Sequence, residues 1–163
     1  MLELRHRHRL RRKEIQNIAD EIEAALGVKT FDEDAAVDMA DAQKLEVVIF
    51  DNVVIGVILD GKAFLTLRGL FRWPAAQRFV SIDEGAIRFI CNGADVMGPG
   101  ITGADLAIQA GDNVWVRDAK HLKPLAIGKA LVDGRTLASK APGKAVKNLH
   151  YIGDELWNLG VTG

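Results

Sequence analysis

Residues 82–101 read IDEGAIRFICNGADVMGPGI, and this stretch joins a short helical pattern to a loop rich in glycine. The serine before it begins the run Ser81–Ile82–Asp83–Glu84, which fits a capping box that satisfies free amides at a helix start. Apolar residues then recur at helical spacing and predict one buried face, made by Ile82, Ala86, Phe89 and Ile90. Gly93 is placed to end the helix. The stretch therefore predicts a short capped helix that leads directly into a loop.

The loop after the helix contains Gly93, Gly98 and Gly100, with Pro99 between the last two. Glycine allows tight turns and the close approach of another chain, and exposed loop amides can hold phosphate oxygens. No Lys-Ser or Lys-Thr pair follows, so the loop is not a nucleotide-binding P-loop. A structural turn between a helix and a strand needs glycine for the same steric reason. Composition alone therefore leaves both a ligand-binding loop and a structural turn open.

Short alternating segments follow the loop and predict β-strands. They are VWVRD at 114–118, KPLAIGKALVD at 123–133 and NLHYIGDELWNL at 148–159. The segment DGRTLASKAPGKAVKN at 133–148, with four basic residues, is expected to be the most flexible loop. The second half of the chain therefore predicts a barrel-like β domain with one helix near its start.

The first half predicts a small, separate α+β domain. A short charged strand is expected first, and a helix over about 12–26 follows, because one helical face carries Ile15, Ile18, Ile22 and Leu26. Between Val37 and Leu67, β-branched runs broken by Asp-Asn and Asp-Gly pairs predict three or four antiparallel strands. The segment LFRWPAAQ at 70–77 is the expected junction. The predicted domains are therefore 1–77 and 78–163.

Charge is distributed unevenly along the 163 residues, although the net charge is only −1. Residues 1–13 carry six Arg or Lys and one Glu, whereas residues 14–60 carry two Lys and twelve Asp or Glu. The near-neutral total therefore does not exclude a polyanionic partner. The single cysteine, Cys91, excludes an internal disulfide and is expected to be a buried thiol. No apolar run reaches the roughly 20 residues of a membrane helix and no secretory signal is present, so we expect a cytoplasmic protein without membrane contact.

Two motifs carry a resemblance to a known family. IDEGAIRFICNGADVMGPGI resembles the opening helix and glycine-rich loop of a PUA domain, an RNA-binding pseudo-barrel named after pseudouridine synthases and archaeosine transglycosylases. GKAVKNLHYIGDELW at 143–157 is similar to the last strands of the subgroup that includes the malignant-T-cell-amplified-sequence protein and ligatin. Those relatives place a small α+β domain before the PUA domain. The resemblance is strong over 78–159 and is one of architecture and length over 1–77. It implies an α+β fold with a helix-plus-antiparallel-sheet domain followed by a PUA pseudo-barrel.

The resemblance also implies where RNA lies, because PUA domains generally hold it against the first helix, the glycine-rich loop and nearby strands. The corresponding residues here are Arg78, Arg88, Gly93, Ala94, Asp95, Met97, Gly98, Pro99, Gly100, Ile101, Lys147 and His150. Arg88 falls off the apolar helix face and should be exposed. Met97 and Ile101 could contact a base or fill the core. His150 and Tyr151 alternate on a strand, so one should face outward.

The run RHRHRLRRK at 5–13 is a second basic patch, made by Arg5, Arg7, Arg9, Arg11 and Arg12. It could contact RNA phosphates, or its charges could offset the acidic residues that follow. His6 and His8 would share one strand face, but no third ligand accompanies them, so no metal is expected. The acidic run DEDAAVDMAD at 32–41 is expected to be solvated rather than catalytic.

The sequence therefore favours a non-catalytic, translation-associated RNA-binding protein that needs no cofactor. The resemblance implies contact with tRNA, rRNA or the small ribosomal subunit. One alternative is an RNA-modification enzyme or its accessory subunit, although residues 1–77 show no nucleophile–base pair. The other alternative is a protein-interaction module that docks a translation factor.

Overall fold

The computed structural model describes residues 1–160 and divides into two units. The first unit contains Met1–Ala76 together with the chain from Glu155 onward, and the second contains Gln77–Asp154. The second unit is thus shorter than the predicted domain 78–163. The reason is Leu156, which is 7% exposed and packs in the core of the first unit against residues such as Val47 and Val54.

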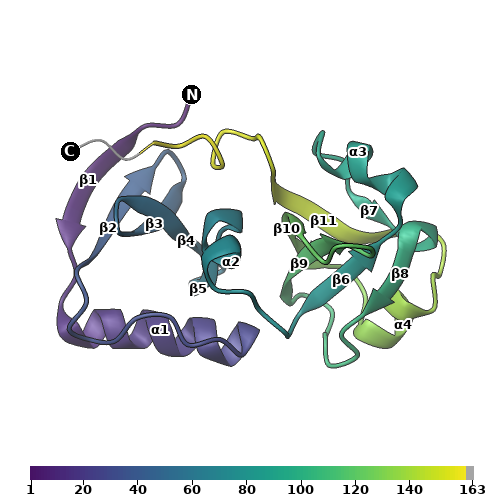
Figure 1. Ribbon diagram of the computed structural model, residues 1–163, viewed down its shortest axis with the longest axis horizontal. Coiled ribbons are helices and arrows are strands. Elements are labelled where there is room, and N and C mark those ends of the chain that lie inside the picture. Colours follow the sequence, from purple (N-terminus) through teal and green to yellow (C-terminus); the bar gives the residue numbers. More distant parts are fainter. Residues whose placement is uncertain (161–163) are drawn as a thin grey trace. The chain divides into compact units, whose positions relative to one another are not determined.

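The first unit is a five-stranded antiparallel sheet with two helices (Figure 1). Its strands occur in chain order and each pairs with the next: β1 (Leu4–Arg9), β2 (Val37–Ala42), β3 (Leu45–Phe50), β4 (Val53–Leu59) and β5 (Lys62–Leu65). Helix α1 (Arg12–Leu26) has the predicted bounds and ends at Gly27, whose φ of 70° is left-handed. It crosses the sheet from the β1 side to the β5 side and buries Ile22 and Leu26 completely.

Helix α2 (Leu67–Arg72) was not predicted and occupies part of the expected junction. It is capped by Thr66, whose hydroxyl accepts a hydrogen bond from the Gly69 N–H. The four strands between Val37 and Leu67 are confirmed. Their turns use left-handed residues that include Gln43, as well as the predicted Asp51–Asn52 and Asp60–Gly61 pairs.

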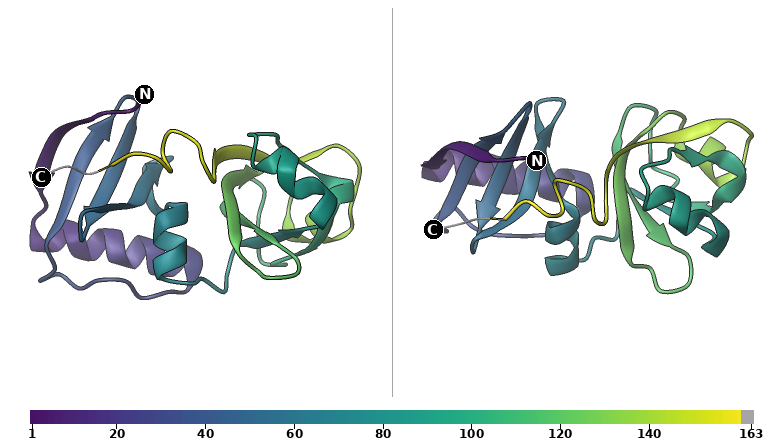
Figure 2. Two further views of the ribbon diagram at one scale, coloured as in Figure 1. Left: turned by 45° about the horizontal axis from the view of Figure 1, so that its top comes forward. Right: turned by 90° about the horizontal axis from the view of Figure 1, so that it is seen from above.

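The second unit is a near-closed pseudo-barrel of mixed strands, shown from two sides in Figure 2. Its sheet order is β7-β11-β10-β9-β6-β8, and the β6–β9 pair is parallel. The strands are β6 (Phe79–Ile82), β7 (Val96–Met97), β8 (Ile101–Ala104), β9 (Asn113–Asp118), β10 (Pro124–Ala130) and β11 (Lys144–Tyr151). The helical elements are η1 (Glu84–Ala86), α3 (Ile87–Ile90), η2 (Gly98–Gly100) and α4 (Gly134–Ala138). This α+β architecture confirms the predicted fold class.

Two local predictions in this unit are wrong. Ser81 does not cap the helix, because it lies in β6 and its hydroxyl accepts a hydrogen bond from Arg117 Nε at 2.9 Å. The cap is Asp83, whose carboxylate accepts from the Ala86 N–H at 3.0 Å. The segment expected to be a flexible loop contains α4, which begins at Gly134 and is capped by the Asp133 carboxylate. Within residues 1–160, no helix combines the length and the apolar character needed to cross a bilayer.

Candidate nucleic-acid interface

A pocket of about 350 Å³ opens between α3 and the glycine-rich loop. Most of its wall is apolar, and one carboxylate and one ammonium group complete it; the lining residues are Ala86, Phe89, Ile90, Ala94, Asp95, Val96, Met97, Gly100 and Lys144. The Lys144 ammonium lies 3.5 Å from the Asp95 carboxylate. Four of the predicted RNA-contact residues, Ala94, Asp95, Met97 and Gly100, are therefore brought together here.

Phe89 and Met97 present apolar surface at this pocket, being 54% and 48% exposed. The prediction that Phe89 belongs to the buried helix face is wrong. Its spacing was counted from Ile82 along one α-helix, whereas Ile82 is in β6 and a 3₁₀ turn precedes α3. Flat or flexible apolar side chains that remain in solvent suit stacking against an unpaired base.

Two basic side chains lie at the pocket, Arg88 beside Phe89 and Lys144 in the wall, and a third, Lys147, is exposed further along β11. Arg88 is exposed as predicted, and its guanidinium lies 4.9 Å from the centroid of the Phe89 ring. Lys147 is exposed on β11. Lys144, which the sequence reasoning missed, pairs with Met97 across the β7–β11 ladder. Its only signal in the sequence is its position at the start of the final strand.

Two of the three loop glycines, Gly93 and Gly98, are needed by the protein's own packing. A Cβ at Gly98 would lie 1.7 Å from the Ala141 carbonyl oxygen, and the Gly98 N–H donates to the Gly143 carbonyl at 2.9 Å. Gly93 has a φ of +92°, and a Cβ there would lie 3.0 Å from the Tyr151 ring. At these two positions the glycines therefore make room for other segments of the same protein, and this supports the structural-turn alternative.

Several predicted contact residues are not available to a ligand. Ile101 is fully buried and fills the core, and Gly98 is buried against the Ala141 carbonyl group. His150 is 3% exposed, and its Nδ1 lies 2.9 Å from the Asp154 carboxylate. The partly exposed member of the His150–Tyr151 pair is Tyr151. Arg78 lies before the start of β6, at the end of that strand opposite η1, where its Nε is 3.4 Å from Asp112.

One side chain that the sequence reasoning did not single out positions the loop. The Asn148 amide on β11 donates to the carbonyls of Ile90 at 3.1 Å and Ala94 at 3.0 Å. The Asn148 backbone N–H donates to the Asp95 carboxylate at 2.9 Å. The residue therefore ties the end of α3 and the following loop to the sheet.

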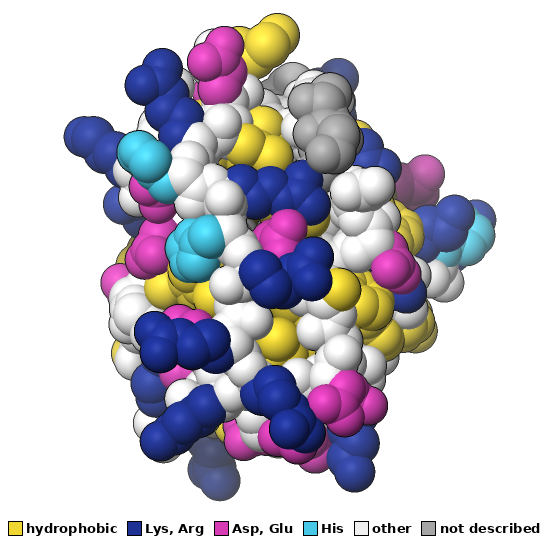
Figure 3. All heavy atoms as spheres, turned by 90° about the vertical axis from the view of Figure 1, so that its left-hand side faces the viewer, with side chains coloured by type: hydrophobic (Ala, Val, Ile, Leu, Met, Phe, Trp, Pro, Cys, Tyr) yellow, Lys and Arg dark blue, Asp and Glu magenta, His cyan; other side chains and the backbone are white. Residues whose placement is uncertain are grey.

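The second basic patch of the first unit is matched by carboxylates. Arg7 and Arg9 donate to Asp38 at 2.8 and 2.6 Å, and Arg12 lies 2.7 Å from Glu33. Burial alone would raise the pKa of Asp38, but the two arginines bring that pKa below its ordinary value. Basic and acidic side chains are both present on the face in Figure 3, with Asp and Glu lying among the Lys and Arg side chains. This pairing supports the alternative in which the patch offsets nearby acidic charge.

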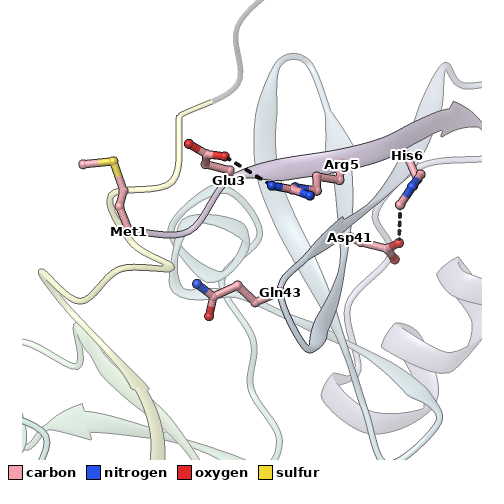
Figure 4. A pocket seen from close by; sticks show the side chains of 6 residues that line it. All are labelled: Met1, Glu3, Arg5, His6, Asp41 and Gln43. Carbon is pink, nitrogen blue, oxygen red and sulfur yellow. Dashed lines mark hydrogen bonds and ion pairs between the residues drawn. The ribbon is translucent and has the colours of Figure 1, made fainter.

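The same pairing continues at the start of β1. A pocket of about 400 Å³ there contains Arg5, which lies 4.0 Å from Glu3, and His6, which lies 3.0 Å from Asp41 (Figure 4). His6 has a φ of 54° and the strand register is irregular, so the expected alternation with His8 is interrupted. Arg11 lies 3.5 Å from Glu14 at the start of α1.

Cys91, at the end of α3, is half-buried rather than fully buried. Burial raises the pKa of its thiol, which makes it a poor nucleophile at neutral pH.

Comparison with known proteins adds to this geometry. The chain matches the PUA domain family over residues 78–152. It is 38% identical to the uncharacterized protein MJ1432 of Methanocaldococcus jannaschii over 162 residues, which cover 97% of this chain and 99% of that protein. It is 36% identical to Translation machinery-associated protein 20 of Eremothecium gossypii over 60% of this chain and 57% of that protein. Malignant T-cell-amplified sequence 1-A of Xenopus laevis is 32% identical over 61% of this chain, and the match again spans 57% of that protein. The chain thus matches little more than half the length of these two relatives.

Solved structures agree over both units. Hypothetical protein PH0734.1 from Pyrococcus horikoshii has a TM-score of 0.82 at 31% identity, covering 93% of this chain and 98% of that one. A conserved PUA domain protein from Thermoplasma acidophilum has a TM-score of 0.79 at 27% identity, covering 93% of this chain and 97% of that one. The PUA domain and the relatives named for the translation machinery support an RNA-binding role associated with translation. The chain therefore belongs to the family of two-domain PUA proteins that includes the Methanocaldococcus jannaschii protein and is related to Translation machinery-associated protein 20 and the malignant T-cell-amplified sequence proteins.

Proposed function

We propose that this chain is a non-catalytic RNA-binding protein of the translation machinery, which contacts tRNA or the small ribosomal subunit through the pocket beside the glycine-rich loop. The observation that carries the proposal is the exposure of Phe89 and Met97 at a pocket with basic side chains around it. We expect the protein to act in the cytoplasm, where translation takes place.

The chemistry of the pocket suits one unpaired nucleotide. A base can lie against Phe89 and Met97, and stacking of this kind contributes about 1–3 kcal/mol per base. Arg88 is already oriented beside the Phe89 ring, where its guanidinium can meet the phosphate of a stacked nucleotide. Lys144, which lines the pocket from β11, adds a second positive charge. Phosphate contacts would position the strand and the pocket would hold the base.

Binding rather than catalysis is part of this proposal. The competing proposal, an RNA-modification enzyme, makes a distinct prediction. Incubation with total RNA followed by mass analysis of nucleosides would reveal a modified base if the chain were catalytic, and that result would overturn our proposal.

The test is a titration of labelled tRNA and of purified small ribosomal subunits with the full chain. Phe89→Ala should weaken binding about 10- to 100-fold, the loss expected for one stacked base. Phe71→Ala is the matched control, because Phe71 is 46% exposed in the first unit. Saturable binding by the wild type and a selective loss in Phe89→Ala support the proposal. An absence of saturable binding to either RNA at 100 mM salt contradicts it.

A further inference from the structure

The turn between β9 and β10 carries a compact positive charge outside the pocket. Its residues, 118–123, read DAKHLK. Lys120, His121 and Lys123 are exposed, whereas the only acidic residue, Asp118, is 7% exposed. Neither lysine forms an ion pair within residues 1–160, in contrast to the arginines of the second basic patch. The turn therefore presents two ammonium groups to solvent that form no ion pair within the described residues.

Asp118 holds the main chain of this turn in one conformation. Its carboxylate accepts the backbone N–H groups of His121 and Lys123, the latter at 3.0 Å. Burial alone would raise the pKa of Asp118, but these N–H groups bring it below the ordinary value, so the carboxylate is ionised. Leu122 follows with a φ of 59°, a conformation rare for a branched side chain. The lysines are thus mounted on a fixed backbone, which reduces the entropy lost when they bind a ligand.

The turn lies at the same end of the barrel as the pocket. The Ala119 N–H donates to the Ile82 carbonyl at 3.1 Å, and Ile82 is the last residue of β6. The next residue, Asp83, donates its N–H to the Gly100 carbonyl at 3.0 Å, and both Gly100 and Ala86 line the pocket. Ala86 is four positions after Ile82, a distance of at most about 14 Å along an extended chain. Phosphates of one stacked strand are about 3.4 Å apart along the axis, so this distance corresponds to about four nucleotides.

We propose that the β9–β10 turn is a second RNA-contact site, at which Lys120 and Lys123 bind phosphates of the strand whose base occupies the pocket. This inference rests on the proposed function, because it takes RNA as the ligand of the pocket. It adds a direction to the bound strand, which runs from the pocket past η1 to the turn. The alternative occupant, an acidic segment of a protein, is separated by the experiment below.

The test uses a labelled 12-nucleotide RNA and the double variant Lys120→Ala/Lys123→Ala. Each phosphate contact on a single strand contributes about 0.7 to the slope of log affinity against log salt, which is about fivefold in affinity at 0.1 M salt. The double variant should therefore bind about 25-fold more weakly and lower the slope by about 1.4. Lys44→Ala/Lys62→Ala removes the same two charges from exposed positions of the first unit and should leave affinity within twofold.

The outcomes separate the two proposals. If Phe89→Ala weakens binding while Lys120→Ala/Lys123→Ala leaves the affinity and its salt dependence unchanged, the proposed role of the pocket is supported and this inference is overturned. If the wild type fails to bind the RNA, the proposed function itself fails. A third outcome concerns a complex of the wild type with another protein that survives nuclease treatment. If the lysine variant keeps its RNA affinity but no longer forms that complex, the turn is a protein-docking surface and the inference is also overturned. Thermal unfolding of both double variants provides the check that the fold is intact.

Discussion

The backbone N–H of Asn148 donates to the Asp95 carboxylate over 2.9 Å and joins β11 to the loop that forms the pocket. The Asn148 side chain extends this link, since its amide reaches the carbonyls of Ile90 and Ala94. Asp95 also faces Lys144 at 3.5 Å. The pocket therefore depends on one strand residue that does not line it.

Asn148→Ala should lower the free energy of unfolding by about 2–3 kcal/mol, because two carbonyl groups lose their side-chain donor. It should also weaken RNA binding, since the loop is no longer tied to β11. Urea unfolding and RNA titration measure the two effects. Asn92→Ala removes an exposed asparagine amide just before the loop residues Ala94 and Asp95, and it should change neither the stability nor the RNA affinity. Equal behaviour of the two variants would show that Asn148 does not position the loop.

Gly98→Ala should destabilise the second unit by about 3 kcal/mol or more, because the new Cβ would overlap the Ala141 carbonyl oxygen at 1.7 Å. Gly103→Ala is the matched control, since Gly103 has open space around its Cβ position and no left-handed φ. That control should stay within about 0.5 kcal/mol of the wild type in urea unfolding. A well-folded Gly98→Ala protein of unchanged stability would contradict the packing described for the loop.

The elements best predicted from the sequence are those held by local signals. Helix α1 has continuous apolar spacing and a glycine at its end, and the strands between Val37 and Leu67 are separated by turn residues. Helix α2 was missed because its six residues are too few to show a period. Leu156 was assigned to the second domain by chain continuity, whereas its burial depends on strands far earlier in the sequence.

The candidate site was predicted only in part, because some of its residues are placed by local signals and others by contacts with distant strands. The motif identified the loop, and Arg88 is exposed as expected. The position of Phe89 depends on where β6 ends, which is determined by pairing with β9 more than thirty residues away. The nearness of Lys144 to the pocket depends on its pairing with Met97. Long-range pairings of this kind leave no local pattern in the sequence.

Leu156→Ala should lower the stability of the first unit by about 2–5 kcal/mol, the range for a leucine removed from a packed core. Leu106→Ala is the control, because Leu106 is 63% exposed. Hydrogen exchange of the two proteins measures the effect unit by unit. Faster exchange confined to β1–β5 is expected for Leu156→Ala, and unchanged exchange there would show that the C-terminal segment adds nothing to this core.

Asp38 makes the stability of the first unit dependent on pH in the acid range. Its folded pKa is below the ordinary 3.8, so its contribution is complete above that value and is lost as the pH falls through the folded pKa. Asp38→Asn should therefore be less stable than the wild type at pH 7 and should lose less stability between about pH 4 and pH 2. Glu46→Gln, at an exposed position of β3, should keep the wild-type profile. Parallel profiles for Asp38→Asn and the wild type would refute the role of the Arg7–Asp38–Arg9 cluster.

The most direct test of the central claim is a titration of the isotopically labelled full chain with tRNA, followed by amide NMR. The account predicts that shift changes concentrate at residues 86–100 and at Lys144, which surround the pocket, with further changes in the β9–β10 turn. Phe89→Ala should reduce these changes at equal RNA concentration. Shift changes confined to β1 and α1, or an absence of changes around the pocket when RNA is bound, would contradict the account.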